Sequence, residues 1–192
     1  MKITSNYGWR NHPDGSGRKF HAGIDLVWYH KAPIKPFIEG RVIYSGDGKS
    51  GTGVGGFGNV VVIEDVFKRA HVYAHLDSVN VKVNQVIKKS DVIGYQGATG
   101  KFVTGSHLHY ELRKKSSPSL GWTSNQEKST IDPTPFIKGG GQVSKLKTDG
   151  SLGPATIKRL QEFMGTKVDG KISTPKSNVI VELQKFLNKY GK

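Results

Sequence analysis

Two histidines stand two positions apart in a short segment whose intervening positions are apolar. In SHLHYELR, residues 106–113, one set of alternate positions is polar and the other is apolar. The polar set is His107, His109, Glu111 and Arg113. Because successive side chains of a β-strand point to opposite faces, the two histidines would lie side by side on one face. Two adjacent imidazoles suit metal chemistry, since one can bind a metal and the other can act on what the metal binds.

Two earlier segments show the same alternation. In FHAGIDL, residues 20–26, His21 and Asp25 fall on one face and the apolar side chains on the other. In AHVYAHL, residues 70–76, the pattern predicts that His71, Tyr73 and His75 face away from the core. If these strands are neighbours in a sheet, their polar faces form a histidine-lined groove.

Composition restricts the chemistry that such a groove can perform. The chain of 192 residues has no cysteine, which excludes disulfides and thiolates and leaves histidine, carboxylate and water as metal ligands. The net charge of +14 favours a polyanionic partner, either nucleic acid or an anionic polymer of a cell wall. Because no helix-turn-helix, zinc-finger or RNA-stacking signature is present, we do not expect nucleic acid to be the partner.

The elements that must position these residues divide the chain into two parts. Residues 1–138 contain short β-branched runs between glycine turns, which predict a mainly antiparallel β-domain, sandwich-like, with an open groove. Residues 139–145 include three consecutive glycines and are predicted to be a linker. No apolar run is long enough for a membrane span, and MKITSNYGWR has no apolar region of a secretory signal.

Residues 146–192 are predicted to form a small, mainly α-helical module. An Asp-Gly pair followed by Leu-Gln-x-Phe occurs twice, with Leu160–Gln161 in the first copy and Leu183–Gln184 in the second. Each unit is too small to bury a core alone, so the two are expected to share one. The predicted core residues are Ile157, Leu160, Met164, Val179, Leu183, Phe186 and Leu187.

The motifs HAGIDL, YAHL and TGSHLHYEL, in that order, resemble the signatures of the lysostaphin/LytM-type zinc endopeptidases, which cut peptide cross-links of bacterial peptidoglycan. The resemblance covers residues 3–137. It implies that His21, Asp25 and His109 bind Zn²⁺ and leave a fourth position for water. It further implies that His75 and His107 are catalytic without binding the metal, and that Tyr73 helps to hold the substrate or oxyanion.

Other polar residues receive weaker or no assignments. Glu111 is expected either to hold a histidine tautomer or to form a cross-strand ion pair. His12, His30 and His71 receive no role. The approach to the last motif, TGKFVTG, is one residue longer than is usual in the family, which affects the expected loop shape and substrate preference rather than metal binding.

The helical module is similar to the peptidoglycan-binding repeats of cell-wall hydrolases, phage endolysins in particular; a plain helical appendage or dimerisation arm is the alternative. The sequence therefore predicts a monomeric zinc endopeptidase of peptidoglycan with a wall-targeting module that also meets anionic wall polymers. A phage endolysin would stay in the host cytoplasm until lysis, whereas a processed secreted autolysin would be extracellular. The remaining alternative is a catalytically inactive wall-binding or regulatory protein of the same family.

Overall fold

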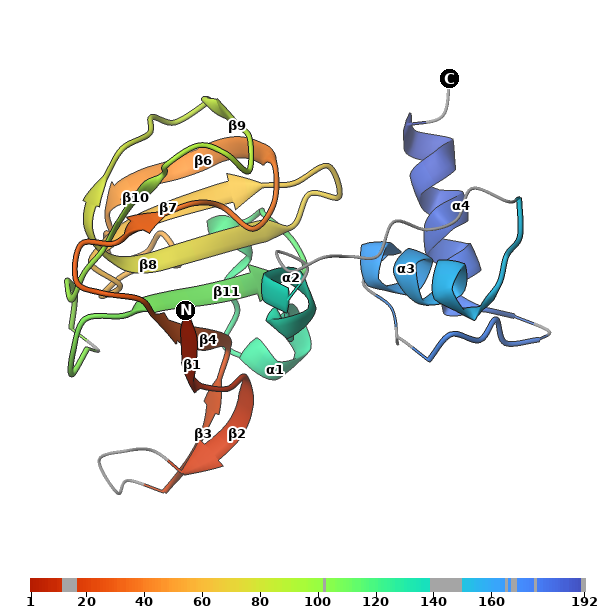
Figure 1. Ribbon diagram of the computed structural model, residues 1–192, viewed down its shortest axis with the longest axis horizontal. Helices are drawn as coiled ribbons and strands as arrows, with labels where there is room; N and C mark the ends of the chain where they lie inside the picture. The colour runs from red at the N-terminus through yellow and green to blue at the C-terminus, as the bar shows by residue number, and fades with distance from the viewer. Residues whose placement is uncertain are drawn as a thin grey trace. The chain divides into compact units, whose positions relative to one another are not determined.

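The computed structural model describes residues 1–11, 17–101, 103–138, 150–164, 166, 169–174 and 176–190. The chain divides into two compact units, Met1–Lys138 and Gly139–Lys192. Unit 1 is mainly antiparallel sheet and the described residues of unit 2 include two helices (Figure 1), which confirms the predicted fold class. The predicted linker, residues 139–145, and His12 lie outside the described residues.

One antiparallel sheet organises unit 1, and its main path runs β1-β4-β11-β8-β7-β6-β9 (Figure 1). A separate two-stranded hairpin pairs β2 with β3. The strands are β1 Lys2–Ser5, β2 Gly8–Asn11, β3 Arg18–His21, β4 Gly23–Val27, β5 Pro33–Ile34, β6 Gly40–Asp47, β7 Asn59–Glu64, β8 Ala70–Val79, β9 Val86–Ile87, β10 Gly94–Gln96, β11 Leu108–Arg113 and β12 Thr130–Ile131. The short helices of this unit are η1 Ser119–Gly121, α1 Gln126–Ser129 and α2 Thr134–Lys138.

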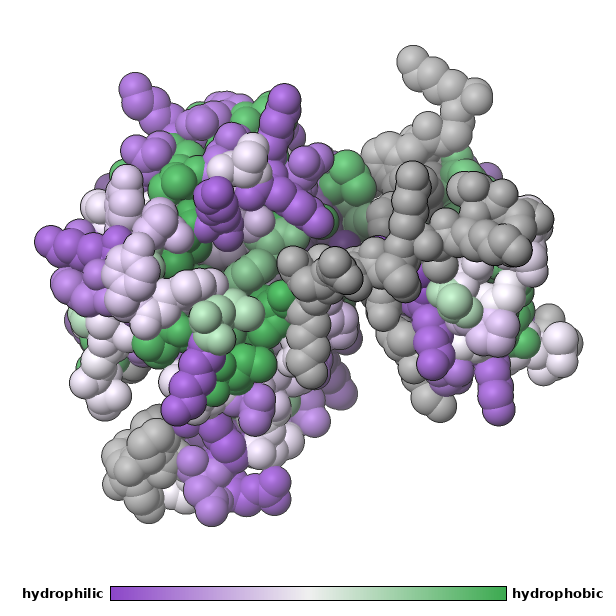
Figure 2. Space-filling model, viewed as in Figure 1, coloured by the Kyte–Doolittle hydropathy of each residue, from purple (hydrophilic) through white to green (hydrophobic). Residues whose placement is uncertain are grey.

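Both faces of the main sheet carry buried apolar side chains. The larger cluster includes Ile24 and Leu26 of β4, Leu108 and Tyr110 of β11, and Tyr73 of β8. A smaller cluster on the other face consists of Val54, Val60, Val62, Ala70, Val72 and Ala74. Hydrophilic side chains are spread over the visible surface, including the β2–β3 hairpin at the lower end of the view (Figure 2).

The prediction for the faces of β8 is wrong over most of its length. In the pairing with β11, Ala74 lies opposite His109 and Val72 opposite Glu111, so the small apolar residues share the face of the histidine site. Tyr73 lies opposite Tyr110 and therefore points to the larger core. A sequence pattern of alternation shows two faces but does not say which of them carries the site.

His75 returns to the site face because the alternation of β8 is interrupted beside it. Its φ is +63°, which is rare for a residue with a side chain, and the pairing of β7 with β8 shifts register between Asn59 and Val61. The His75 N–H donates to the carbonyl of Phe57 at 3.0 Å. Backbone strain of this kind persists only where the surrounding contacts maintain it.

Unit 2 contains α3, Pro154–Met164, and α4, Asn178–Tyr190, which contact each other. Val179 is buried, and Ile157, Leu160, Met164 and Leu183 are partly buried. Leu187 is 51% exposed, so its assignment to the core is wrong; two short helices have too little volume to cover every apolar side chain. The side chain of Phe186 lies outside the described part. No described helix is both long and apolar enough to cross a membrane.

The repeated sequence pattern of unit 2 has a physical basis in one buried glutamine. The Gln161 amide nitrogen donates to the Asp169 carboxylate at 2.9 Å and to the Lys171 carbonyl at 2.8 Å. Its oxygen accepts from the N–H groups of Asp169 at 3.0 Å and Gly170 at 2.8 Å. Leu-Gln of the first copy therefore holds Asp-Gly of the second. Gly150 and Gly170, the glycines of the two Asp-Gly pairs, both adopt φ +73°.

We expect Gln161→Ala to destabilise unit 2 locally by about 2 kcal/mol, because it leaves the buried N–H of Gly170 and the partly buried N–H of Asp169 without acceptors. Hydrogen exchange of the amides of α3 and of Asp169 and Gly170 should then accelerate by about thirtyfold in the full-length protein. Gln184→Ala is the matched control, since Gln184 occupies the same repeat position and is exposed. Equal effects of the two substitutions would contradict the role given to Gln161.

Candidate metal centre

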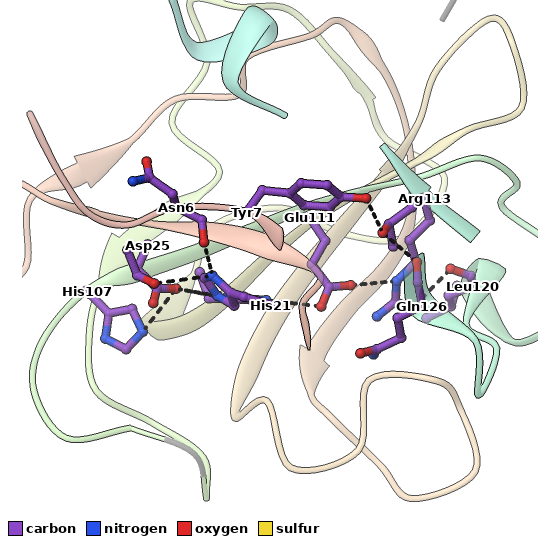
Figure 3. Close-up of polar contacts among 12 residues, drawn as sticks. Asn6, Tyr7, His21, Asp25, His107, Glu111, Arg113, Leu120 and Gln126 are labelled. Carbon is purple, nitrogen blue, oxygen red and sulfur yellow. Dashed lines mark hydrogen bonds and ion pairs between the residues drawn. The ribbon is translucent and has the colours of Figure 1, made fainter. Parts of the chain in front are cut away.

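The hairpin and two neighbouring strands bring three potential ligand atoms together. His21 Nε2 lies 3.1 Å from His109 Nδ1, and Asp25 Oδ1 lies 2.9 Å from His109 Nδ1 and 3.3 Å from His21 Nε2. His109 and Asp25 are direct partners in the pairing of β11 with β4, while His21 ends β3 just before β4 begins. Figure 3 shows His21 and Asp25 converging from these elements.

The three atoms lie close to the spacing of a tetrahedral zinc face. Ligands at about 2.0–2.2 Å from zinc and at tetrahedral angles lie about 3.3–3.6 Å apart, slightly farther than the 2.9–3.3 Å that separates these atoms. Two imidazole nitrogens and one carboxylate oxygen are also donors that zinc accepts, and three protein donors leave a fourth position open. Among the described residues, His21, Asp25 and His109 form the group of histidines and carboxylates able to hold a metal.

Backbone carbonyls orient the imidazoles of His21, His75 and His107 in the same way. In each ring Nδ1–H donates to a carbonyl: that of Asn6 at 2.8 Å, Thr99 at 3.0 Å and Gly105 at 2.8 Å, respectively. A proton held on Nδ1 leaves the lone pair on Nε2, which can bind a metal or accept a proton. The carbonyl acceptors were not identifiable from the sequence, because a main-chain group carries no sequence signal.

His109 has the opposite orientation, and a buried ion pair explains why. Its Nε2–H donates to Glu111 Oε1 at 3.0 Å, which leaves Nδ1 facing Asp25 and His21. The second oxygen of Glu111 accepts from Arg113 Nε at 2.7 Å, and Arg113 also donates to the Leu120 carbonyl at 3.1 Å (Figure 3). Both roles considered for Glu111 are therefore realised together: it orients a histidine and pairs with an arginine.

Electrostatics favour a positive charge at the point where the three ligand atoms meet. Burial alone would raise the pKa of Asp25, but hydrogen bonds and charge from His109 and His21 hold it well below its usual range. Burial would likewise raise the pKa of Glu111, but Arg113 and His109 lower it to about 2. Burial lowers the pKa of His109, yet Asp25 and Glu111 outweigh it and raise that pKa to about 9. The carboxylates of Asp25 and Glu111 therefore stay ionised on either side of the His109 imidazole. Their negative charge creates an electrostatic field that attracts a cation.

His75 and His107 lie beside this centre and line the same cavity of about 360 Å³. Their ring centroids are 4.9 Å apart, and His75 lies 5.7 Å from His109. Burial lowers the pKa of His75, and the nearby His109 and His107 lower it further, to about 4. His75 is therefore a neutral imidazole at neutral pH, with the Nε2 lone pair available as a base.

The structure does not bring Tyr73 to this centre. Tyr73 is fully buried on the opposite face of the sheet, where its hydroxyl accepts from the Phe37 N–H at 2.9 Å. The expectation that Tyr73 faces the substrate is therefore wrong, because the irregularity at His75 separates the two side chains. His71 is also buried on that face, with hydrogen bonds to Tyr110 and Asp65, while His30 is exposed and contacts Ser106.

The cavity also has walls that the motifs did not indicate. Arg10 and Lys19 of the β2–β3 hairpin, Phe57 from the loop before β7, and Gln126 at the start of α1 all contribute. Arg10 and Lys19 lie in segments whose basic residues resemble any solvated surface. Their position beside a ligand follows only from the pairing of β2 with β3.

An imidazole–carboxylate centre with one open position, flanked by two unliganded histidines, is the type of site used by mononuclear metallopeptidases. Residues 19–120, just over half of the chain, match the model of peptidase family M23. The chain belongs to that family.

Named relatives agree with this assignment. Peptidoglycan DD-endopeptidase ShyB of Vibrio cholerae is 34% identical over 120 residues, which are 61% of this chain and 26% of ShyB. The crystallised catalytic domain of lysostaphin from Staphylococcus simulans is 27% identical, with a TM-score of 0.56 over 71% of this chain and 92% of that domain. A zinc-containing peptidase from Vibrio cholerae is 34% identical, with a TM-score of 0.50 over 58% of this chain and 33% of that protein. The chain spans about a quarter of the length of the curated relatives that it matches first.

We expect Tyr73→Phe to keep peptidase activity on purified cell walls within about twofold of the unsubstituted protein. The substitution removes an acceptor from the partly buried Phe37 N–H, so it should lower the free energy of unfolding by about 1–3 kcal/mol. His75→Ala, two residues along the same strand, supplies the contrast because it should abolish most activity. A tenfold loss in Tyr73→Phe with its zinc content intact would restore a catalytic role.

Proposed function

We propose that the protein is a zinc-dependent endopeptidase that hydrolyses peptide cross-links in bacterial peptidoglycan. The observation that carries this proposal is the triangle of His21 Nε2, Asp25 Oδ1 and His109 Nδ1, with sides of 2.9–3.3 Å, beside two unliganded histidines. Membership of family M23 and the similarity to a peptidoglycan DD-endopeptidase and to lysostaphin support the substrate class.

The residues divide the chemistry between them. When bound, zinc would polarise the scissile carbonyl and lower the pKa of a water molecule towards about 7. His21, Asp25 and His109 hold the metal, and the Glu111–Arg113 pair keeps the Nδ1 atom of His109 turned towards it. His75, neutral because its pKa is about 4, accepts the proton of the attacking water.

His107 occupies the other side of the reacting groups. Its Nε2 lies 3.7 Å from Asp25 Oδ1, next to the proposed ligands, but His107 is not in the group of His21, Asp25 and His109 whose donor atoms all lie within 4.8 Å of one another. From there it stabilises the oxyanion or protonates the leaving amine. The open cavity suits an extended, branched peptide, since peptidoglycan stems are not compact ligands.

We further propose that residues 146–192 form a module that targets the enzyme to the wall, with phage endolysin as the biological context. The buried Gln161 network supports a folded two-copy unit, and the sequence resemblance to peptidoglycan-binding repeats supplies the role. Nine basic and four acidic residues between 146 and 192 give this segment a charge of +5, suited to anionic wall polymers. The proposed boundaries are residues 1–138 for catalysis, 139–145 for the linker and 146–192 for targeting.

Substitution of individual histidines tests the catalytic proposal. His21→Ala should lose both zinc and activity, because it removes a ligand. His75→Ala and His107→Ala should retain most of the zinc but lose at least about a hundredfold in rate, since general acid–base groups contribute about 10²–10⁴-fold. Zinc is measured by elemental mass spectrometry, and the bond cut is identified from the amino group newly freed in wall digests.

His30→Ala is the matched control, because His30 is exposed and outside the cavity lining. Full zinc content and full activity in His21→Ala would reject the proposed ligand set. A protein that binds zinc tightly but cleaves no wall of any cross-bridge type would favour the inactive, wall-binding alternative.

Removal of residues 139–192 tests the targeting proposal. The truncated protein should lyse intact cells or walls much more slowly, while it cleaves a small soluble cross-linked peptide at the full rate, because the proposed zinc site lies wholly in unit 1. The full-length protein should sediment with walls less well as salt is added, since exposed charges are screened beyond about 8 Å at physiological ionic strength. Equal lysis by both proteins would leave unit 2 as a plain appendage.

A further inference from the structure

Gln96 is a buried amide that joins separate segments of unit 1 beside the proposed catalytic histidines. It is the last residue of β10, and its side chain is 0% exposed. Its Oε1 accepts from the Trp28 N–H at 2.9 Å. Its Nε2 donates to the Ser106 carbonyl at 3.2 Å and to Ser106 Oγ at 3.1 Å. Both ends of the amide are therefore bonded, and the nitrogen holds the residue that precedes His107.

The backbone of Gln96 is bonded on both sides as well. Its N–H donates to the Ala32 carbonyl at 2.8 Å, and its carbonyl accepts from the Lys31 N–H at 2.9 Å. In the pairing of β10 with β8, Gln96 lies opposite Leu76, the residue after His75. A buried amide that gave up these bonds would leave polar groups without partners, so it has few other arrangements. Gln96 is thus a rigid attachment point within the sheet.

His107 needs such an attachment because it lies just outside the regular part of the sheet. β11 begins at Leu108, and its pairing with β8 begins only at His109. His107 itself is joined to Gly97 by an isolated bridge, in which its N–H donates to the Gly97 carbonyl at 2.9 Å. Segments with few backbone hydrogen bonds open most easily. The ladder of β11 alone therefore does not fix the backbone that carries this ring.

The orientation of the His107 ring depends on the same stretch of backbone. Its Nδ1–H donates to the Gly105 carbonyl at 2.8 Å, two residues earlier in the chain. Thr104 and Gly105 are exposed, so packing does little to hold them in place. The bonds from Gln96 reach Ser106, which lies between the ring and the carbonyl that orients it. Gln96 thereby fixes the backbone on which both groups depend.

We propose that Gln96 is a positioning residue that holds His107 in its reactive place through Ser106. This inference rests on the proposed endopeptidase function and adds to it a residue outside the cavity. Gln96 is not among the described residues that line the cavity of the candidate metal centre, so its effect on the reaction passes through His107. A misplacement of about 1 Å in a catalytic group can lower a rate about a hundredfold, so a contact to the preceding residue matters for kcat.

Gln96→Met tests this role in the zinc-loaded full-length protein, because methionine has a similar length but lacks the amide. The substrate is a soluble cross-linked stem-peptide dimer prepared from walls that the unsubstituted protein digests. The kcat should fall at least about tenfold, while KM stays within about twofold and the zinc content is unchanged. The backbone amide of His107 should exchange its hydrogen faster, by a factor at least about tenfold larger than that for Tyr110 and Leu112 of β11.

Tyr73→Phe is the matched control for a general loss of stability. Like Gln96→Met, it removes a buried side-chain acceptor from a backbone N–H, but on the face of the sheet opposite the candidate metal centre. It should change neither kcat nor the exchange of the His107 amide by more than about twofold.

Ser106 supplies a milder variant that tests the same contact. Ser106→Ala removes the Oγ acceptor but leaves the carbonyl bond to Gln96, so kcat should fall about threefold. Ser106→Thr keeps a hydroxyl group and should restore the rate. The other partner of Ser106 Oγ is the exposed His30, and His30→Ala separates its contribution from that of Gln96.

A kcat in Gln96→Met within about twofold of the unsubstituted protein would overturn the positioning role, as would a loss of zinc that accounts for the lost activity. If Gln96→Met does not fold, equal rates of Ser106→Ala and the unsubstituted protein would overturn it. If the unsubstituted protein cleaves no wall, the proposed endopeptidase function fails, and the His107 amide decides the positioning separately. Faster exchange of that amide in Gln96→Met would then support the contact, and unchanged exchange would reject it.

Discussion

The antiparallel pairing of β4 with β11 is the constraint on which the candidate metal centre depends. Its register places His109 opposite Asp25 and Glu111 opposite Gly23. A side chain at Gly23 would begin 2.4 Å from the Tyr110 carbonyl oxygen and 2.9 Å from the His109 ring, so only glycine allows the strands to approach this closely. A shift of one residue in this register would turn His109 to the opposite face and separate it from Asp25.

The same face of the sheet must also leave room for the imidazoles. Ala74 of β8 lies opposite His109 and belongs to a buried cluster of alanine and valine, whose small side chains leave the proposed ligands uncovered. His75 then reaches the cavity through a left-handed backbone conformation. Two hydrogen bonds hold it there, from its backbone N–H to the Phe57 carbonyl and from its ring Nδ1–H to the Thr99 carbonyl. A strained residue beside the candidate metal centre agrees with the tendency of strain to gather at functional sites, where the rest of the fold maintains it.

Networks of buried polar side chains stabilise both units in the same way, because their hydrogen bonds fix the orientation of each side chain. In unit 1, the series His109–Glu111–Arg113 fixes one ring orientation and ends at the Leu120 carbonyl. In unit 2, Gln161 bonds to the N–H groups of Asp169 and Gly170, to the Asp169 carboxylate and to the Lys171 carbonyl. A buried polar group without a partner is costly, so each network favours a single arrangement of the residues around it.

The sequence by itself determined the mainly antiparallel fold, the helical character of the second unit, and the set of histidines and carboxylate that converge. Strand alternation is a local property that placed His21, Asp25, His75, His107 and His109 on polar faces, together with His71 and Tyr73. The resemblance of three motifs to the LytM-type family then singled out the proposed ligands and catalytic histidines. Which face of β8 meets the site was decided only by tertiary structure, because the pairing with β11 turns Tyr73 into the core and the left-handed conformation of His75 then returns that histidine to the site. The cations of the hairpin beside His21 and the carbonyls that orient each ring were likewise decided by strand pairing, since contacts between distant segments leave no local pattern.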